Sequence, residues 1–161
     1  MSIEFQMCAI SAASYPGVVS GEQDWEPTGE GVSLGKAWAV LFRVLNSGED
    51  AANPQRVALA VSGGEHIEAH GDYGGPRVLS PRLVAAIAAD LDGSGDDDED
   101  SPFYREALDE QEIRRRFRYV DQSGAYEEGR DVESVLWAFR VLRDFYREAA
   151  AAGEAVVICL G

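Results

Sequence analysis

The stretch from residue 131 to 161 constrains the fold most, because a long amphipathic helix there turns directly into an apolar strand. Apolar side chains recur every three or four positions from Val132 to Ala150, the spacing of one face of an α-helix. Gly153 stands where a residue in the left-handed conformation would end this helix. Residues 155–160 are apolar at every position, so both faces of that strand must be covered. We therefore predict that this helix and strand form the core of the protein.

The length of the chain, 161 residues, predicts one domain spanning residues 1–161, since a domain usually takes ~100–200 residues. Residues 3–10 alternate between more and less apolar positions, which predicts a strand that pairs with the C-terminal one. The expected fold is therefore α+β, with a small mixed sheet that includes the N- and C-terminal strands and is packed by several helices. The acidic run at residues 96–100 is expected to be a mobile, solvated loop.

Further helices are predicted between the two terminal strands. Residues 34–45 carry an apolar stripe at helical spacing, and Ser80 followed by a proline is typical of a helix start. Asp109 has the capping-box spacing that begins another helix. Residues 57–61 fit either a short strand or a helical turn, because so short an apolar run has no resolvable period. These residues, or residues 78–79, are the candidates for an additional strand.

The charge of the chain limits the classes of partner. There are 29 acidic and 14 basic side chains, which gives a formal net charge of −15. Nucleic acid requires a basic footprint, and an anionic membrane surface attracts basic segments, so neither is an expected partner. A protein with a basic face is compatible with this charge.

The ends of the chain and its two cysteines indicate the cytoplasm. No apolar run approaches the ~20 residues of a membrane span. Residues 1–5 lack the basic and apolar regions of a signal peptide. Cys8 and Cys159 fall in predicted core strands without metal-ligand spacing, so reduced and packed thiols are expected.

A glycine-rich loop at residues 63–77 holds both histidines of the chain and is the candidate ligand-binding segment. The side chains that could supply an acid, a base and an anchor are Glu65, His66, His70, Asp72, Tyr73 and Arg77. His66 and His70 have the i, i+4 spacing of a helical metal site, but Gly64 and Gly71 lie close beside them and disfavour a helix. Polar loop residues are therefore favoured here, and no metal, cofactor or catalytic residue is assigned.

Residues 90–101 partly match a calcium-binding loop. Asp90, Asp92 and Ser94 occupy the first three ligand positions, and Gly95 occupies the position of the sharp turn. Ser101, however, stands where a bidentate glutamate should close the site. A solvated acidic loop is the favoured interpretation.

The basic side chains gather in one place, at Arg114, Arg115, Arg116 and Arg118. Such a cluster could clamp a phosphate or a carboxylate. The favoured interpretation is an exposed helix face whose arginines pair with the neighbouring acids Asp109, Glu110 and Glu112.

Three segments, in their order and spacing, resemble a known family. They are residues 36–42 (KAWAVLF), 73–81 (YGGPRVLSP) and 145–158, which contains FYREA and GEAVVI. Together they resemble the YfbM-like family, a bacterial family of small cytoplasmic proteins classed as a domain of unknown function. The chain differs in an extra glycine within the Tyr-Gly-Pro turn and in the longer acidic run at 96–100. The resemblance implies an α+β fold with both termini in one sheet, and it implies no activity.

Two functions follow as hypotheses. The first is a non-catalytic, acidic cytoplasmic binding protein with a basic protein partner, for which an immunity-like role against a cationic toxin is one concrete form. The alternative is a small-molecule enzyme or ligand binder that uses residues 63–77. Convergence of the side chains of that loop on a concave pocket would separate the second hypothesis from the first.

Overall fold

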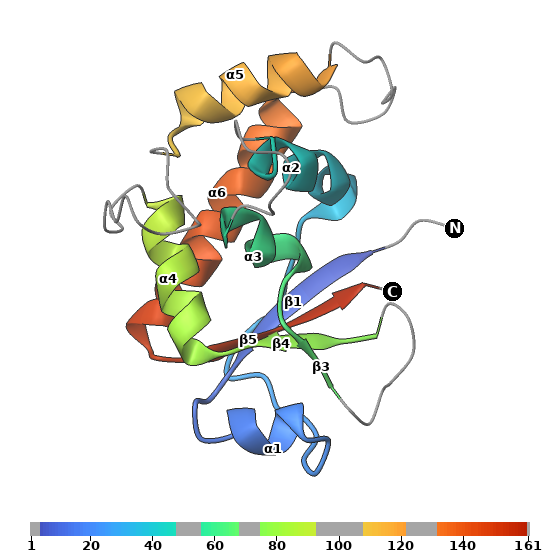
Figure 1. The fold of residues 1–161 in the computed structure, drawn as a ribbon, viewed down its shortest axis with the longest axis vertical. Coiled ribbons are helices and arrows are strands. Elements are labelled where there is room, and N and C mark those ends of the chain that lie inside the picture. Colours follow the sequence, from blue (N-terminus) through green and yellow to red (C-terminus); the bar gives the residue numbers. More distant parts are fainter. Residues whose placement is uncertain (1–3, 48–55, 68–74, 93–107, 122–131, 161) are drawn as a thin grey trace.

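The fold places helices above a five-stranded sheet and one short helix below it (Figure 1). The computed structural model describes residues 4–47, 56–67, 75–92, 108–121 and 132–160. Near the two ends of the described chain, Phe5 lies opposite Leu160 on neighbouring strands of the sheet (Figure 1). The protein is a single α+β domain with both terminal strands in one sheet, as predicted.

Every strand pairing in the described residues is antiparallel. The sheet has the order β2-β1-β5-β4-β3. Its strands are β1 (Phe5–Ile10), β2 (Val32–Ser33), β3 (Glu65–His66), β4 (Arg77–Leu79) and β5 (Ala155–Leu160). The sheet was predicted to be mixed. It is antiparallel because the chain leaves β4 and returns into β5 at the same end of the sheet, which sets Leu79 opposite Val156.

The central strand β5 is buried on both faces, as its apolar sequence predicted. Its first four residues, 155–158, are all buried. Val156 and Ile158 join the large core under the helices. Val157 joins a smaller core on the opposite face, together with Ile10 and Val18. Burying one such side chain contributes roughly 1.5–3 kcal/mol, so this strand holds the two layers together.

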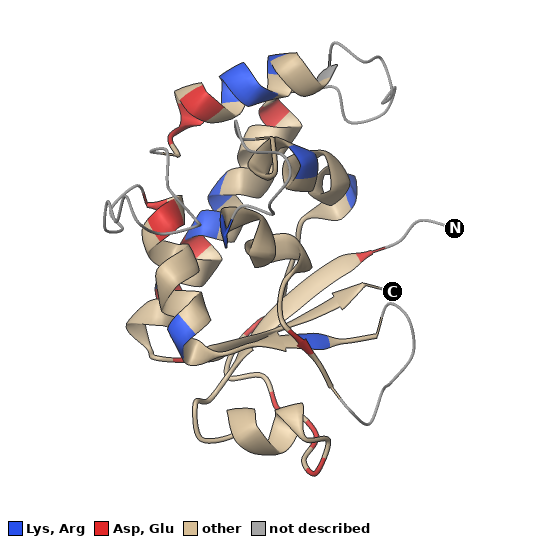
Figure 2. Cartoon of the chain, viewed as in Figure 1, with Lys and Arg blue, Asp and Glu red and all other residues tan. Residues whose placement is uncertain are grey.

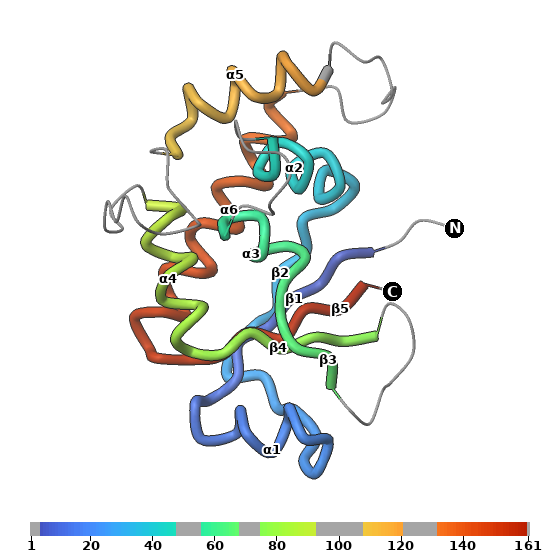
Figure 3. The backbone as a smooth tube through the Cα atoms, in the orientation of Figure 1, coloured from blue at the N-terminus to red at the C-terminus, as the bar shows by residue number. Residues whose placement is uncertain are grey.

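The long helix α6 (Val132–Ala151) runs from the top of the molecule down to the sheet (Figures 1 and 3). Gly153 ends it with a φ of +67°, the left-handed conformation expected there. The main-chain N–H of Glu154 donates to the carbonyl of Ala149 at 2.9 Å, which closes the last turn. Tyr146 is fully buried, and its hydroxyl donates to the carbonyl of Ala60 at 2.7 Å. This bond fastens α6 to the middle of the molecule.

The other helices enclose α6 and the upper face of the sheet, except for α1 (Tyr15–Val19), which lies beneath it (Figure 1). Their bounds are η1 (Gly35–Ala37), α2 (Trp38–Leu45), η2 (Arg56–Ala58), α3 (Leu59–Ser62), α4 (Pro81–Leu91) and α5 (Glu110–Asp121). Residues 57–61 are therefore helical, which resolves the alternative that their sequence left open. Ser80 caps α4 as predicted, since its hydroxyl accepts from the main-chain N–H of Leu83 at 3.2 Å. Among the described residues, no helix is both long and apolar enough to cross a membrane.

Candidate functional site

The described part of the histidine loop places its side chains on different faces of the sheet. Strands β3 and β4 pair Glu65 with Val78 and His66 with Arg77. Val78 belongs to the lower core, beside α1, so Glu65 shares that lower face. Its charge also helps to raise the pKa of Tyr15 on α1, although burial is the larger cause. His66 and Arg77 lie on the opposite, upper face. The structure thus brings His66 and Arg77 together and separates Glu65 from them.

Exposure and hydrogen bonding define what these residues do in the fold. Glu65 and His66 are both exposed. Arg77 is half-buried, and its Nη1 donates to the carbonyl of Ser62 at 2.9 Å, so it stabilises the end of α3. The other three predicted site residues, His70, Asp72 and Tyr73, lie outside the described part of the chain. That this loop binds a ligand therefore stays a prediction.

Asp90 and Asp92, the first two ligand positions of the calcium-like loop, both bind arginines. Asp90 is 3% exposed and receives two hydrogen bonds from Arg56, at 2.5 Å from Nε and 2.6 Å from Nη2. Asp92 accepts hydrogen bonds from Arg147. Carboxylates that already pair with guanidinium groups, one of them buried, are poorly placed to bind calcium as well. Residues 93–101 of this motif lie outside the described chain.

The arginine cluster on α5 pairs with Glu112, as predicted, but it is not an exposed helix face throughout, because Arg116 is buried. Glu112 accepts from Nε of Arg115 and from Nε of Arg116, both at 2.9 Å. Arg116 is only 2% exposed and also donates to a main-chain carbonyl of α2 at 3.3 Å. Arg114 instead reaches α6, where it binds Glu133 at 3.0 Å. Arg114 and Arg116 thus link α5 to α6 and α2, whereas Arg115 bonds within α5.

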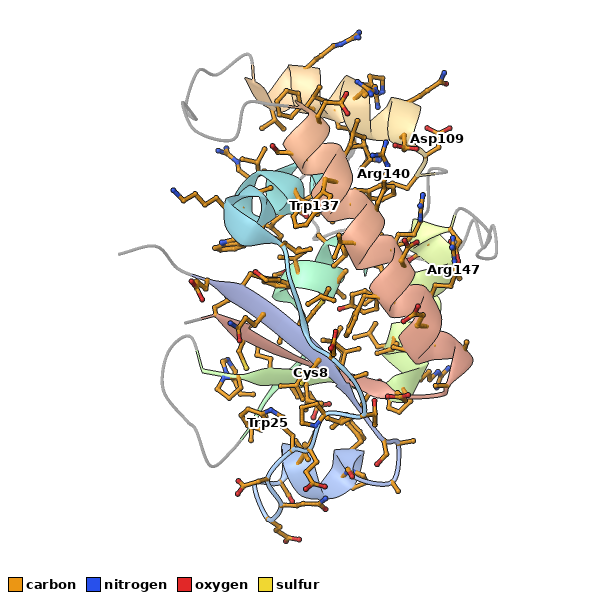
Figure 4. The ribbon with its side chains drawn as sticks, turned by 180° about the vertical axis from the view of Figure 1, so that it is seen from behind. Cys8, Trp25, Asp109, Trp137, Arg140 and Arg147 are labelled. Carbon is orange, nitrogen blue, oxygen red and sulfur yellow. The ribbon has the colours of Figure 1, made fainter. Side chains whose placement is uncertain are left out.

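The two cysteines share a cavity of about 450 Å³ on the lower face of the sheet. Cys8 and Cys159 sit on the adjacent strands β1 and β5, and both are free and half-buried. Trp25 also lines this cavity (Figure 4). Burial, and to a lesser extent the nearby Cys159, raises the pKa of the Cys8 thiol to about 11. At neutral pH the thiol is therefore protonated and a weak nucleophile, in keeping with a packing role.

A second concavity, also about 450 Å³, lies between α6 and the segment that leads into β2. Its floor is apolar, formed by Val32, Val141 and Phe145 among others. Its charged lining consists of four carboxylates, with no lysine or arginine; they are Glu30, Asp144, Glu148 and Glu154. We call this concavity the acidic groove. It combines apolar surface with an excess of negative charge, which suits a cationic group that carries an aliphatic stem.

The four carboxylates of the acidic groove differ in how far they are neutralised. Among the described residues, Glu30 and Glu148 form no ion pair and are exposed. Asp144 meets the guanidinium groups of Arg143 and Arg147 only at 3.5 Å. Arg147 lies closer to Asp92 than to Asp144. The hydrogen bond with Asp92 is the largest cause of the raised pKa of Arg147.

The fourth carboxylate, Glu154, accepts a hydrogen bond from the hydroxyl of Thr28. A hydroxyl carries no charge, so this bond orients the carboxylate and leaves its negative charge in place. The C-terminus of α6 lies close by, and the negative end of the helix dipole adds to the negative potential. The groove therefore remains strongly anionic.

A third concavity, of about 490 Å³, lies higher on the same side of α6. It is lined by Trp137 of α6 and by residues 34–37, which include η1. Trp137 is 50% exposed, which is unusual for the side chain with the largest apolar area. Figure 4 shows this tryptophan on the outward side of α6, above the sheet.

Sequence reasoning placed some of these side chains correctly but did not find the groove. The helical period puts Asp144 and Glu148 on the outward face of α6, one turn apart. Glu30 and Glu154 come from other parts of the chain. The antiparallel pairing of β1 with both β2 and β5 brings their segments to the same place. The feature of the sequence that could have indicated the groove is the pair of carboxylates at i and i+4, Asp144 and Glu148, close to the apolar Val141.

Fold and site together define a small α+β domain with an acidic, partly apolar groove beside its longest helix. In the described residues, no group of three or more His, Cys, Asp and Glu side chains is arranged to hold a metal ion. Along the described chain, acidic residues occur at many points and basic residues mainly on the upper helices (Figure 2).

Comparison with known proteins identifies the family. The model of the DUF1877 family, a domain of unknown function, matches residues 13–159, so the chain belongs to this family. A similar solved structure is that of YfbM from Escherichia coli, a protein of unknown function. The two are 17% identical, with a TM-score of 0.59 over 98% of this chain and 99% of that one. No curated protein matches. The resemblance to the YfbM-like family is confirmed, and at this identity the structural likeness shows the fold alone.

Proposed function

We propose that this protein is a non-catalytic cytoplasmic binding protein whose partner is a protein with a basic surface. The observation that carries the proposal is the acidic groove, which has four carboxylates, no basic side chain and an apolar floor. The net charge of −15 adds a long-range attraction for a cationic partner. An immunity-like protein that neutralises a cationic toxin is one concrete form of this role.

The exposure of the groove's carboxylates supports binding rather than chemistry. Glu30, Asp144 and Glu148 all lie exposed at an open rim. Fixed charge at an open rim mainly accelerates association and selects a partner of opposite sign.

The alternative, a small-molecule enzyme or ligand binder that uses residues 63–77, has weaker support. Of the described members of that loop, Glu65 points to a different face from His66 and Arg77. None of these three lines the concavities described above. The acidic groove is the better-formed site.

The test compares two variants with the same net charge. The first, Glu30→Gln/Asp144→Asn/Glu148→Gln, neutralises the groove with near-isosteric side chains. The control, Glu4→Gln/Glu22→Gln/Asp24→Asn, removes as many charges from exposed positions that do not line the groove. Tagged versions are used to co-purify partners from a bacterial lysate at low and at high salt.

The expected result is a basic protein that the wild type and the control retain at low salt and that the groove variant loses. High salt should release it from both, because screening weakens exposed charge pairs. Equal retention by the groove variant and the control would refute the proposal, as would the absence of any basic partner at every salt concentration.

A further inference from the structure

The acidic groove and the concavity at Trp137 are built from the same two segments. One wall of each is α6, and the other is the chain between residues 28 and 37. Val141 of the acidic groove lies one helical turn from Trp137. On the other wall, Val32 and Leu34 are two residues apart along the chain. Figure 4 shows the segment that carries β2 passing beside α6 below Trp137. The two concavities share no lining residue, but they lie one above the other between the same two segments, and we call the two together the groove along α6.

The exposed ridge of α6 gives this groove a helical repeat. Trp137, Val141, Asp144 and Glu148 stand at positions i, i+4, i+7 and i+11, which fall on one side of a helix. At 1.5 Å per residue, the ridge extends ~16 Å from the tryptophan to the last carboxylate. This is about three helical turns, the length over which an amphipathic helix usually binds a groove through its anchor side chains.

The chemistry changes along the ridge. At the upper end, the lining holds one acid, Glu133, which is bonded to Arg114, and one base, Lys36, so this end has no excess of negative charge beside the exposed indole of Trp137. At the lower end, the carboxylates of the acidic groove dominate, and none of its lining residues is basic. An occupant complementary to both ends needs an apolar side chain at one end and positive charge at the other.

We propose that the groove along α6 binds an amphipathic helix of a partner protein, with a bulky apolar residue against Trp137 and lysine or arginine residues two to three turns away against Asp144 and Glu148. This inference rests on the proposed function and adds the form of the partner. Charge complementarity selects the basic end, and the aromatic side chain provides the anchor that such interfaces commonly use.

The probes are two synthetic helical peptides of identical composition. In the first, one phenylalanine lies two to three turns from four lysines on the same face. In the second, the same residues are reordered so that the phenylalanine lies on the opposite face from the lysines. Their affinities are measured by isothermal titration calorimetry at low salt, with the wild type and with Trp137→Ala. The control is Tyr119→Ala on α5, which removes another exposed aromatic side chain, 71% exposed and outside the groove.

The first peptide should bind the wild type and Tyr119→Ala at least about tenfold more tightly than the second, a difference of about 1.4 kcal/mol. Trp137→Ala should remove that difference. Equal affinity of the two peptides, no binding of either, or equal behaviour of Trp137→Ala and Tyr119→Ala would overturn the inference. If a lysate partner depends on the carboxylates but not on Trp137, the proposed function stands and the helical docking mode fails.

Discussion

The two faces of α6 differ in burial and in the role that we assign to them. The inward face, with Phe139 and Tyr146, is fully buried and joins the helix to the sheet and to α3. The outward face, with Trp137 and Glu148, lies open to solvent over the groove. The inward face contributes most of the stability of the helix in the fold, since packing of an apolar face outweighs intrinsic propensity. The outward face is thus available for binding.

The sharpest test of this division compares two large-to-small substitutions on the same helix. Phe139→Ala should lower the free energy of unfolding by about 3–5 kcal/mol, because it leaves a cavity in the core. Trp137→Ala should cost only about 1 kcal/mol, because half of the side chain is already in water and solvent fills the space. Urea unfolding followed by circular dichroism measures both. Similar costs for the two variants would contradict the division.

A smaller effect is expected from the polar contact of the inward face. Tyr146→Phe keeps the ring but leaves the carbonyl of Ala60 without its donor in the core. The cost should be about 1–3 kcal/mol, the penalty of an unsatisfied buried polar group. Thermal unfolding of this variant beside the wild type provides the measurement. An unchanged melting temperature would show that another donor replaces the hydroxyl.

The smallest of the three effects concerns pH and the attachment of α5. Hydrogen bonds from Arg115 first, and from Arg116, lower the pKa of Glu112 from 4.5 to about 2. Because the pKa is lower in the folded state, this stabilisation is complete above about pH 4.5 and is lost as the pH falls towards 2. Glu112→Gln should therefore lose stability at neutral pH and show a flatter decline between pH 5 and 2.

The pH experiment needs a reference carboxylate. Glu22→Gln, at an exposed position far from these arginines, should keep the acid-induced decline of the wild type. Unfolding in urea at a series of pH values would reveal the difference. A parallel decline in all three proteins would show that the Glu112 interaction does not contribute to folding.

Contacts between distant segments also explain why the match to a calcium-binding loop is misleading. Asp90 and Asp92 match a calcium loop by spacing, but the fold uses them to bind Arg56 and Arg147. Spacing describes which residues are near one another along the chain. It does not reveal that an arginine 34 or 55 residues away along the chain binds the same carboxylate.

The sequence by itself determined the local elements of this protein. The period of apolar residues in α6, the uniform apolarity of β5, the cap at Ser80 and the helix end at Gly153 are local properties of the chain. They depend on backbone geometry over a few residues, and each was predicted. The structure of residues 57–61 could not be predicted in this way, because this apolar run is too short to show a helical or strand period.

Only the tertiary structure decided the direction of the strands and the position of the groove. The antiparallel order follows from the path of the chain through α4 and α6, which no local pattern encodes. The acidic groove joins Glu30, Asp144 and Glu154 from distant segments. Their meeting depends on how the apolar faces pack together, since burial of those faces dominates the folding free energy and carries the exposed charges to wherever the packing places them.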